Sequence, residues 1–212
     1  MKRLFTLILT VLSLNVLGQI NFNFEIDDLT VWTQKPTGRW QASTSSPLAE
    51  TRSLKHTFNN TASATDTIYY PLPTWNVTKG DVTWRMLIRH GNDPSTSNGW
   101  WVYLMSDGTT MTTSGTGSGY AVGVNLTGSD DLLKIWRVTN GTPQIILTST
   151  LNWQTQIGTG KAGAIEVQRL ANGTFTLKAS VNGVFTDLVN YGSIVDINHT
   201  AFVNFGILYR YT

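Results

Sequence analysis

Three of the four Asn-Gly dipeptides, those at positions 140–141, 172–173 and 182–183, constrain the fold of this chain most strongly, because each one separates two strand-like runs. Both residues of such a pair readily adopt the positive φ angles that tight β-hairpin turns require. The sequence therefore predicts that LLKIWRV pairs with QIILTS and that AIEVQR pairs with TFTLKAS.

Apolar and polar residues alternate strictly in several other segments, which is the pattern of half-buried strands. The alternation is clear in INFNFEI at residues 20–26, in VTWRMLIR at 82–89 and in TFTLKASV at 174–181. No helical periodicity follows the first residues of the chain. We expect an all-β protein that folds as a two-sheet antiparallel sandwich.

Residues 1–18 have the pattern of a cleaved signal peptide. Two basic residues precede an apolar run at 4–12, and small residues favour cleavage between Gly18 and Gln19. We therefore expect an exported protein, secreted or held at the cell surface, in which residues 19–212 form a single domain. The rest of the chain has no apolar run long enough for a membrane span, so we predict no membrane insertion.

The charge of the domain argues against nucleic acid as a partner. The chain has 15 basic and 13 acidic residues, and removal of Lys2 and Arg3 with the leader leaves 13 of each. A nucleic-acid-binding protein needs a basic stripe, which is absent, so we predict no nucleic-acid partner. The chain also has no cysteine, which excludes disulfides and thiolate metal sites.

The order of these segments resembles a known fold family. INFNFEIDDLTVW, GRWQAS, VTWRMLIRHG, GWWVYLMSDG, GYAVGVNL and FVNFGILYRYT, with the double-turn hairpin from Val167 to Gly183, resemble the concanavalin-A-like or laminin-G-like jelly-roll sandwich. More narrowly, they resemble the N-terminal modules of exported and surface proteins of Bacteroidetes-type bacteria. Such modules continue beyond the last strand, so the resemblance implies that the domain is truncated at Thr212 and that further domains of the same polypeptide are its partners.

Two adjacent tryptophans in NGWWVYLMSDG must point to opposite faces of a strand. Trp100 continues an all-apolar series with Val102 and Leu104, so we assign it to the core. Trp101 and Tyr103 then lie on the other face of the sheet.

That other face is the predicted ligand site. If residues 90–98 join two paired strands, Arg85 and Arg89 lie beside the rings of Trp101 and Tyr103, and Asn125 comes from the next strand. Flat aromatic rings with polar neighbours suit a pyranose, which has an apolar face and polar edges. The structural alternative is that a loop or a neighbouring domain covers this face and that Trp101 only packs.

We therefore predict a non-catalytic recognition or adhesion module that binds a glycan through an aromatic concave face. A purely structural spacer domain and a glycoside hydrolase-like enzyme on the same fold are the alternatives. For the enzyme, Glu25 and Asp27 match the first two positions of the Glu-x-Asp-x-x-Glu strand of family 16 glycoside hydrolases, but the third glutamate is missing.

Metal ligands are sparse in the sequence, and no cofactor is expected. The three histidines are isolated from one another, which does not suit a metalloenzyme site. A structural calcium ion is the one metal that the resemblance implies, and Asp130 and Asp131 offer hard oxygen ligands for it. The alternative for these two aspartates is a solvated turn.

Overall fold

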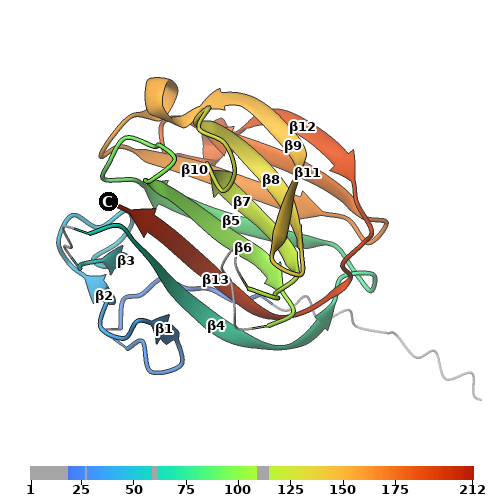
Figure 1. The fold of residues 1–212 in the computed structure, drawn as a ribbon, viewed down its shortest axis with the longest axis horizontal. Coiled ribbons are helices and arrows are strands. Elements are labelled where there is room, and N and C mark those ends of the chain that lie inside the picture. The colour runs from blue at the N-terminus through green and yellow to red at the C-terminus, as the bar shows by residue number, and fades with distance from the viewer. Residues whose placement is uncertain (1–18, 27, 59–61, 109–114) are drawn as a thin grey trace, which may run out of the picture.

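The computed structural model describes residues 19–26, 28–58, 62–108 and 115–212 (Figure 1). The predicted signal peptide and Asp27 lie outside the described residues, and export stays a prediction. The described residues form a two-sheet antiparallel jelly-roll sandwich, which confirms the predicted fold class. Within these ranges, no helix has the length and apolarity that a membrane span requires.

The larger sheet has seven strands in the spatial order β1-β4-β13-β6-β7-β8-β9. Every neighbouring pair in it is antiparallel. Its strands are β1 (Thr33–Lys35), β4 (Ala64–Asn76), β6 (Gly99–Ser106), β7 (Gly119–Val124), β8 (Leu132–Thr139), β9 (Thr142–Asn152) and β13 (Ala201–Tyr211).

The smaller sheet has four strands in the order β12-β11-β10-β5, and a separate hairpin pairs β2 with β3. The remaining strands are β2 (Trp40–Ser43), β3 (Ser53–His56), β5 (Val82–Arg89), β10 (Ala162–Arg169), β11 (Thr174–Ser180) and β12 (Val189–Val195). Two short helical turns, at Trp153–Ile157 and Phe185–Asp187, connect strands.

The two predicted hairpins are confirmed. β8 pairs with β9, and β10 pairs with β11. At the first turn Asn140 and Gly141 have φ angles of 49° and 74°, the positive values that the Asn-Gly pair predicts.

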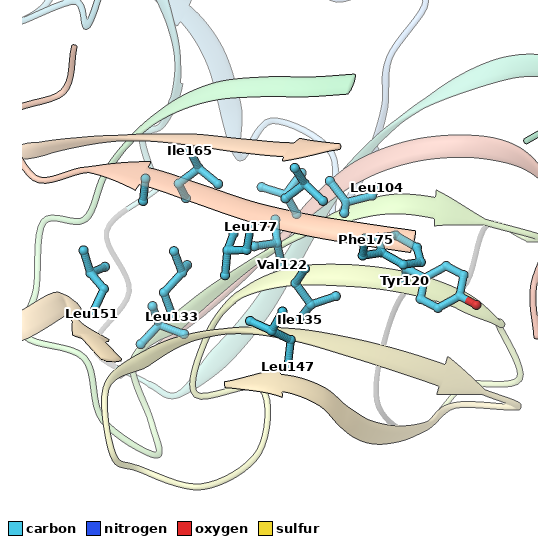
Figure 2. Close-up of a cluster of buried hydrophobic side chains, with 14 of the residues drawn as sticks. Leu104, Tyr120, Val122, Leu133, Ile135, Leu147, Leu151, Ile165, Phe175 and Leu177 are labelled. Atoms are coloured by element: carbon cyan, nitrogen blue, oxygen red, sulfur yellow. The ribbon is translucent and has the colours of Figure 1, made fainter. Parts of the chain in front are cut away.

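The main core lies between the facing sheets (Figure 2). Alternate residues of β11, Phe175, Leu177 and Ala179, are fully buried there, and Trp84 of β5 packs against the same core. The inward faces predicted from alternation are therefore confirmed for these strands. Trp100 is 3% exposed and belongs to this core, as expected.

The N-terminal segment differs from its prediction. Residues 20–26 form no strand, and Phe24 has a positive φ of 58°, which interrupts an extended chain. Phe22 and Phe24 still pack on Trp32, with ring centroids 4.8 Å and 5.6 Å away. The segment therefore acts as an apolar cover over the large sheet without joining it.

The predicted hairpin between residues 82–89 and 99–106 is wrong. β5 pairs with β10 at the edge of the small sheet, whereas β6 lies between β13 and β7 in the large sheet. Residues 90–98 thus carry the chain from one sheet to the other. A periodicity of two fixes which residues share a face of one strand, but it does not fix which strand is the neighbour.

Because the large sheet has three more strands than the small one, part of its inner face extends beyond β5. The segment containing Phe22 and the β2–β3 hairpin cover this part, and Trp32, Trp40 and Ile68 form a second apolar cluster beneath them. This arrangement leaves a hollow between the hairpin and the edge of the small sheet.

Candidate functional site

The outer face of β6 is closed. Trp101 and Tyr103 lie on this face, as their positions in the strand predict, but their exposed fractions are only 1% and 2%. Burial also raises the pKa of the Tyr103 hydroxyl above its ordinary value. The expectation that these two rings lie open to a ligand is therefore wrong.

Arg210 of β13 and the loop after β7 cover this face. The guanidinium of Arg210 lies 4.8 Å from the ring centroid of Trp101 and donates to the backbone oxygen of Asn125 at 2.7 Å. On the loop after β7, the Thr127 hydroxyl accepts from the indole nitrogen of Trp136 at 3.1 Å. Asn125 is itself fully buried and is engaged by the protein.

Arg85 and Arg89 lie elsewhere, because β5 belongs to the other sheet. Arg85 donates a hydrogen bond to Glu166 of β10 at 2.7 Å, and the Arg85 side chain is 62% exposed. Arg89 donates to the backbone oxygen of Ser46, in the loop between β2 and β3. The five predicted ligand residues therefore do not form one surface.

The hollow beside β5 is a cleft of about 1080 Å³, and both arginines line it. β5 forms one wall, and the β2–β3 hairpin with Phe22 and Phe24 forms the other. Its floor is the inner face of β6 and β13, represented by Trp100, Val102, Phe205, Ile207 and Tyr209.

A chain of aromatic rings crosses the cleft. The ring of His56 lies edge-on to Trp40 at 5.1 Å and to Tyr209 at 5.0 Å. Tyr209 in turn meets His90 edge-on, with centroids 5.7 Å apart. Asn92 donates to the Tyr209 hydroxyl at 3.0 Å, which holds this ring at the floor of the cleft.

The two histidines of this chain of rings differ in their partners. The Nε2 atom of His56 lies 2.7 Å from a carboxylate oxygen of Asp66 and is satisfied by it. His90 is 3% exposed, and neither ring nitrogen has a hydrogen-bond partner among the described residues. Burial lowers the pKa of His90 to about 4, against a smaller opposing effect of Asp93, so its ring is neutral at pH 7.

Two indole nitrogens in the same cleft are also unsatisfied. Those of Trp40 and Trp100 are buried and have no partner in the described part of the chain. Buried polar groups in folded proteins nearly always have partners, and an unmade hydrogen bond costs about 1–3 kcal/mol. Together with His90, the residues that line the cleft therefore contribute four buried nitrogen atoms without a partner in the described part of the chain, which a ligand reaches only when the side chains that cover them move.

The catalytic alternative gains no support from Glu25. Its carboxylate accepts hydrogen bonds from the backbone nitrogens of Thr51 and Arg52, at 3.0 Å and 2.9 Å, and from the Thr51 hydroxyl. These bonds lower the pKa of Glu25. The carboxylate thus ties the N-terminal segment to the β2–β3 hairpin, and Asp27 lies outside the described residues.

The predicted calcium ligands are engaged by nitrogen donors. Lys134 donates to both oxygens of Asp130, at 2.6 Å and 2.5 Å, and Asn125 donates to Asp131 at 2.6 Å. Over the described ranges, no three His, Cys, Asp or Glu residues lie together as a metal site. Asp130 and Asp131 in this arrangement do not fit a calcium ion, so the structure gives no support for the predicted calcium site at these two residues.

The described residues thus have the fold of a concanavalin-A-like jelly-roll sandwich, with a cleft beside the edge of the smaller sheet. Neither protein-family models nor curated protein sequences match the chain. Solved structures do match the fold, at low sequence identity.

The exoplasmic/lumenal domain of VIP36, in a form bound to Ca²⁺ and Man3GlcNAc, superposes with a TM-score of 0.59. It is 11% identical over 87% of this chain and 78% of its own. The carbohydrate-binding module CBM66 from Bacillus subtilis has a TM-score of 0.54 and 15% identity, over 85% of this chain and 90% of its own. The Emp46p carbohydrate recognition domain, in a potassium-bound form, has a TM-score of 0.50 and 12% identity, over 89% of this chain and 87% of its own. At these identities the similarity shows the fold alone.

Proposed function

We propose that this domain is a non-catalytic carbohydrate-binding module and that a saccharide occupies the cleft beside β5. The observation that carries the proposal is that His90, Trp40 and Trp100, which line one aromatic cleft, have buried nitrogens without a partner among the described residues. A neutral imidazole offers one donor and one acceptor, and an indole offers a donor. Sugar hydroxyls supply both complements, and the apolar face of a pyranose packs on aromatic rings.

The fold supports this proposal without deciding it. VIP36, CBM66 and the Emp46p domain are described as carbohydrate-bound, carbohydrate-binding or carbohydrate-recognising. One fold hosts many functions, so the argument rests on the site. The signal-peptide pattern of residues 1–18 favours export, and we place the module in a secreted or surface protein of a bacterium.

The test is a glycan array probed with the purified protein, followed by calorimetric titration of the saccharides that bind. His90→Phe keeps a ring of similar size and removes both nitrogens. We expect about tenfold weaker binding, because two net hydrogen bonds are lost. His199→Phe is the matched control, since His199 lies outside the cleft lining and bonds Thr139.

A second pair of variants isolates the indole group. Trp100→Phe and Trp101→Phe each remove a buried, unpartnered indole nitrogen, but only Trp100 lines the cleft. Binding should weaken in the first variant alone. Unchanged binding in both Trp100→Phe and His90→Phe would place the ligand elsewhere, and a blank array with folded protein would favour the spacer. Release of reducing ends from a polysaccharide would favour the enzyme.

A further inference from the structure

The charged residues that line the cleft are unevenly divided. Residues 19–212 contain equal numbers of basic and acidic residues, 13 each. Among the described residues that line the cleft, four are basic and one is acidic: Arg52, Lys55, Arg85 and Arg89 against Glu50. The cleft is therefore more positive than the domain as a whole.

Two of these cations lack an ionic partner. Arg85 is paired with Glu166 at 2.7 Å. Neither Lys55 nor Arg89 has a carboxylate oxygen within 4.0 Å in the described part of the chain. Within the described residues, no carboxylate therefore neutralises these two positive charges.

The same two cations come from opposite walls of the cleft and bind neighbouring residues of one loop. Arg89, from β5, donates to the backbone oxygen of Ser46. Lys55, from β3, donates to the hydroxyl of Ser45 at 3.3 Å. Because Ser45 and Ser46 are adjacent and exposed, the guanidinium and the ammonium group are held by neighbouring residues of the loop at the rim of the cleft.

We infer that the saccharide bound in the cleft carries an anionic group, a carboxylate or a sulfate ester, which Arg89 and Lys55 bind together. This inference rests on the proposed function and specifies its ligand class. Two neighbouring like charges repel each other, and an anion between them replaces repulsion with attraction. The planar guanidinium offers a pair of parallel donors to a carboxylate or sulfate, and the ammonium adds a point charge.

The two parts of the site then bind two parts of one ligand. The rim at Ser45 and Ser46 takes the anionic substituent. Deeper in the cleft, His90 and Trp100 are buried and meet the uncharged hydroxyls. A uronic-acid or sulfated oligosaccharide has both kinds of group, whereas a neutral oligosaccharide leaves the two rim cations without a partner.

The experiment compares neutral, uronic-acid and sulfated oligosaccharides on one array, with the purified protein at about 0.05 M and at about 0.5 M NaCl. We expect binding to anionic members, weakened by salt because exposed charges are screened. Uronate-only or sulfate-only binding identifies which anion the rim accepts. Binding to neutral members alone overturns this inference and leaves the proposed function intact, whereas an array without any binding overturns both.

Single-charge variants test the rim directly. Arg89→Gln and Lys55→Gln should each weaken binding of the best anionic ligand about tenfold and reduce its salt dependence. Lys79→Gln removes one exposed charge outside the cleft lining and should leave affinity unchanged. Lys55 is exposed, so its variant tests the inference even where Arg89→Gln lowers the folded fraction, which circular dichroism measures. Equal affinity in Lys55→Gln, Lys79→Gln and the wild type contradicts the inference.

Discussion

Two aromatic regions lie on opposite faces of the same strand, β6. The outer cluster contains Trp101 and Tyr103, and the cleft contains Trp100. Each region has a buried indole nitrogen without a partner in the described residues and an arginine nearby. From residue types alone, the two regions are equally good candidates for a glycan site.

The two regions differ in how completely other parts of the protein cover their aromatic rings. The outer cluster is sealed by the loop after β7 and by Arg210, so none of its ring faces is available. The cleft lies where the large sheet extends beyond β5, and the rings of Phe22, Phe205 and Tyr209 that line it are only half-buried. Aromatic content therefore identifies packing surfaces and binding surfaces alike, and the path of the connecting segments separates them.

The largest expected effect tests whether the outer cluster is sealed. Trp101→Ala should lower the free energy of unfolding by about 3–5 kcal/mol, as for a large aromatic side chain removed from a core. Trp100→Ala should cost a similar amount, because both tryptophans are almost fully buried. Urea unfolding of the two variants measures both values. A loss below about 1 kcal/mol for Trp101→Ala would show an open outer face in solution.

The next largest effect is the pH dependence of the free energy of unfolding that His90, in the cleft lining, causes. Burial lowers the pKa of His90 from 6.5 to about 4. Between these values the unfolded chain binds a proton that the folded protein does not, so the free energy of unfolding falls as pH falls from 6.5 to 4. The total loss from this one group is about 3 kcal/mol.

Urea unfolding of wild type and His90→Phe at several pH values measures this contribution as a difference. Carboxylates with lowered pKa, such as those of Glu166 and Asp196, are common to both proteins and cancel. At neutral pH the variant should be as stable as the wild type or more so, because two unsatisfied nitrogens are removed. Parallel pH profiles would mean that His90 is solvated in the folded protein.

A smaller effect tests how closely the strands around the outer cluster approach each other. A Cβ atom at Gly123 of β7 would lie 2.2 Å from the backbone oxygen of Trp100. Gly123→Ala should therefore destabilise the protein by about 1–3 kcal/mol, because backbone has to move. Gly80→Ala is the control, since nothing lies within 4 Å of its added Cβ. Equal thermal midpoints would show that β6 and β7 are less tightly packed than described.

Local patterns predicted a large part of the fold. The Asn-Gly turns fixed two hairpins, and alternation placed Trp100 and Phe175 in the core, because hairpin pairing and strand periodicity are local properties. They did not predict that β5 and β6 lie in different sheets. That crossover joins strands through contacts distant in sequence, and it separated Arg85 and Arg89 from Trp101.

The candidate cleft was predicted only in part. Its two arginines were among the expected site residues, whereas Tyr209, Trp40 and His90 were not. Alternation in FGILYRY does place Phe205, Ile207 and Tyr209 on one face, which is a usable signal. The pairing of β13 with β4 and β6, and the hairpin that closes the far wall, depend on tertiary packing that no local pattern contains.

The smallest expected effect concerns the loop that seals the outer cluster. Asn125 and Asp131 bond each other reciprocally across this loop, and Lys134 neutralises Asp130. A bound calcium ion would have to replace both of these nitrogen donors, so we expect that neither calcium nor a chelator changes the thermal midpoint. Asp131→Ala should instead destabilise the protein, because it leaves the buried amide of Asn125 without its acceptor. A midpoint that rises with calcium in the wild type but not in Asp131→Ala would mean that an ion, not these hydrogen bonds, holds the loop closed over Trp101.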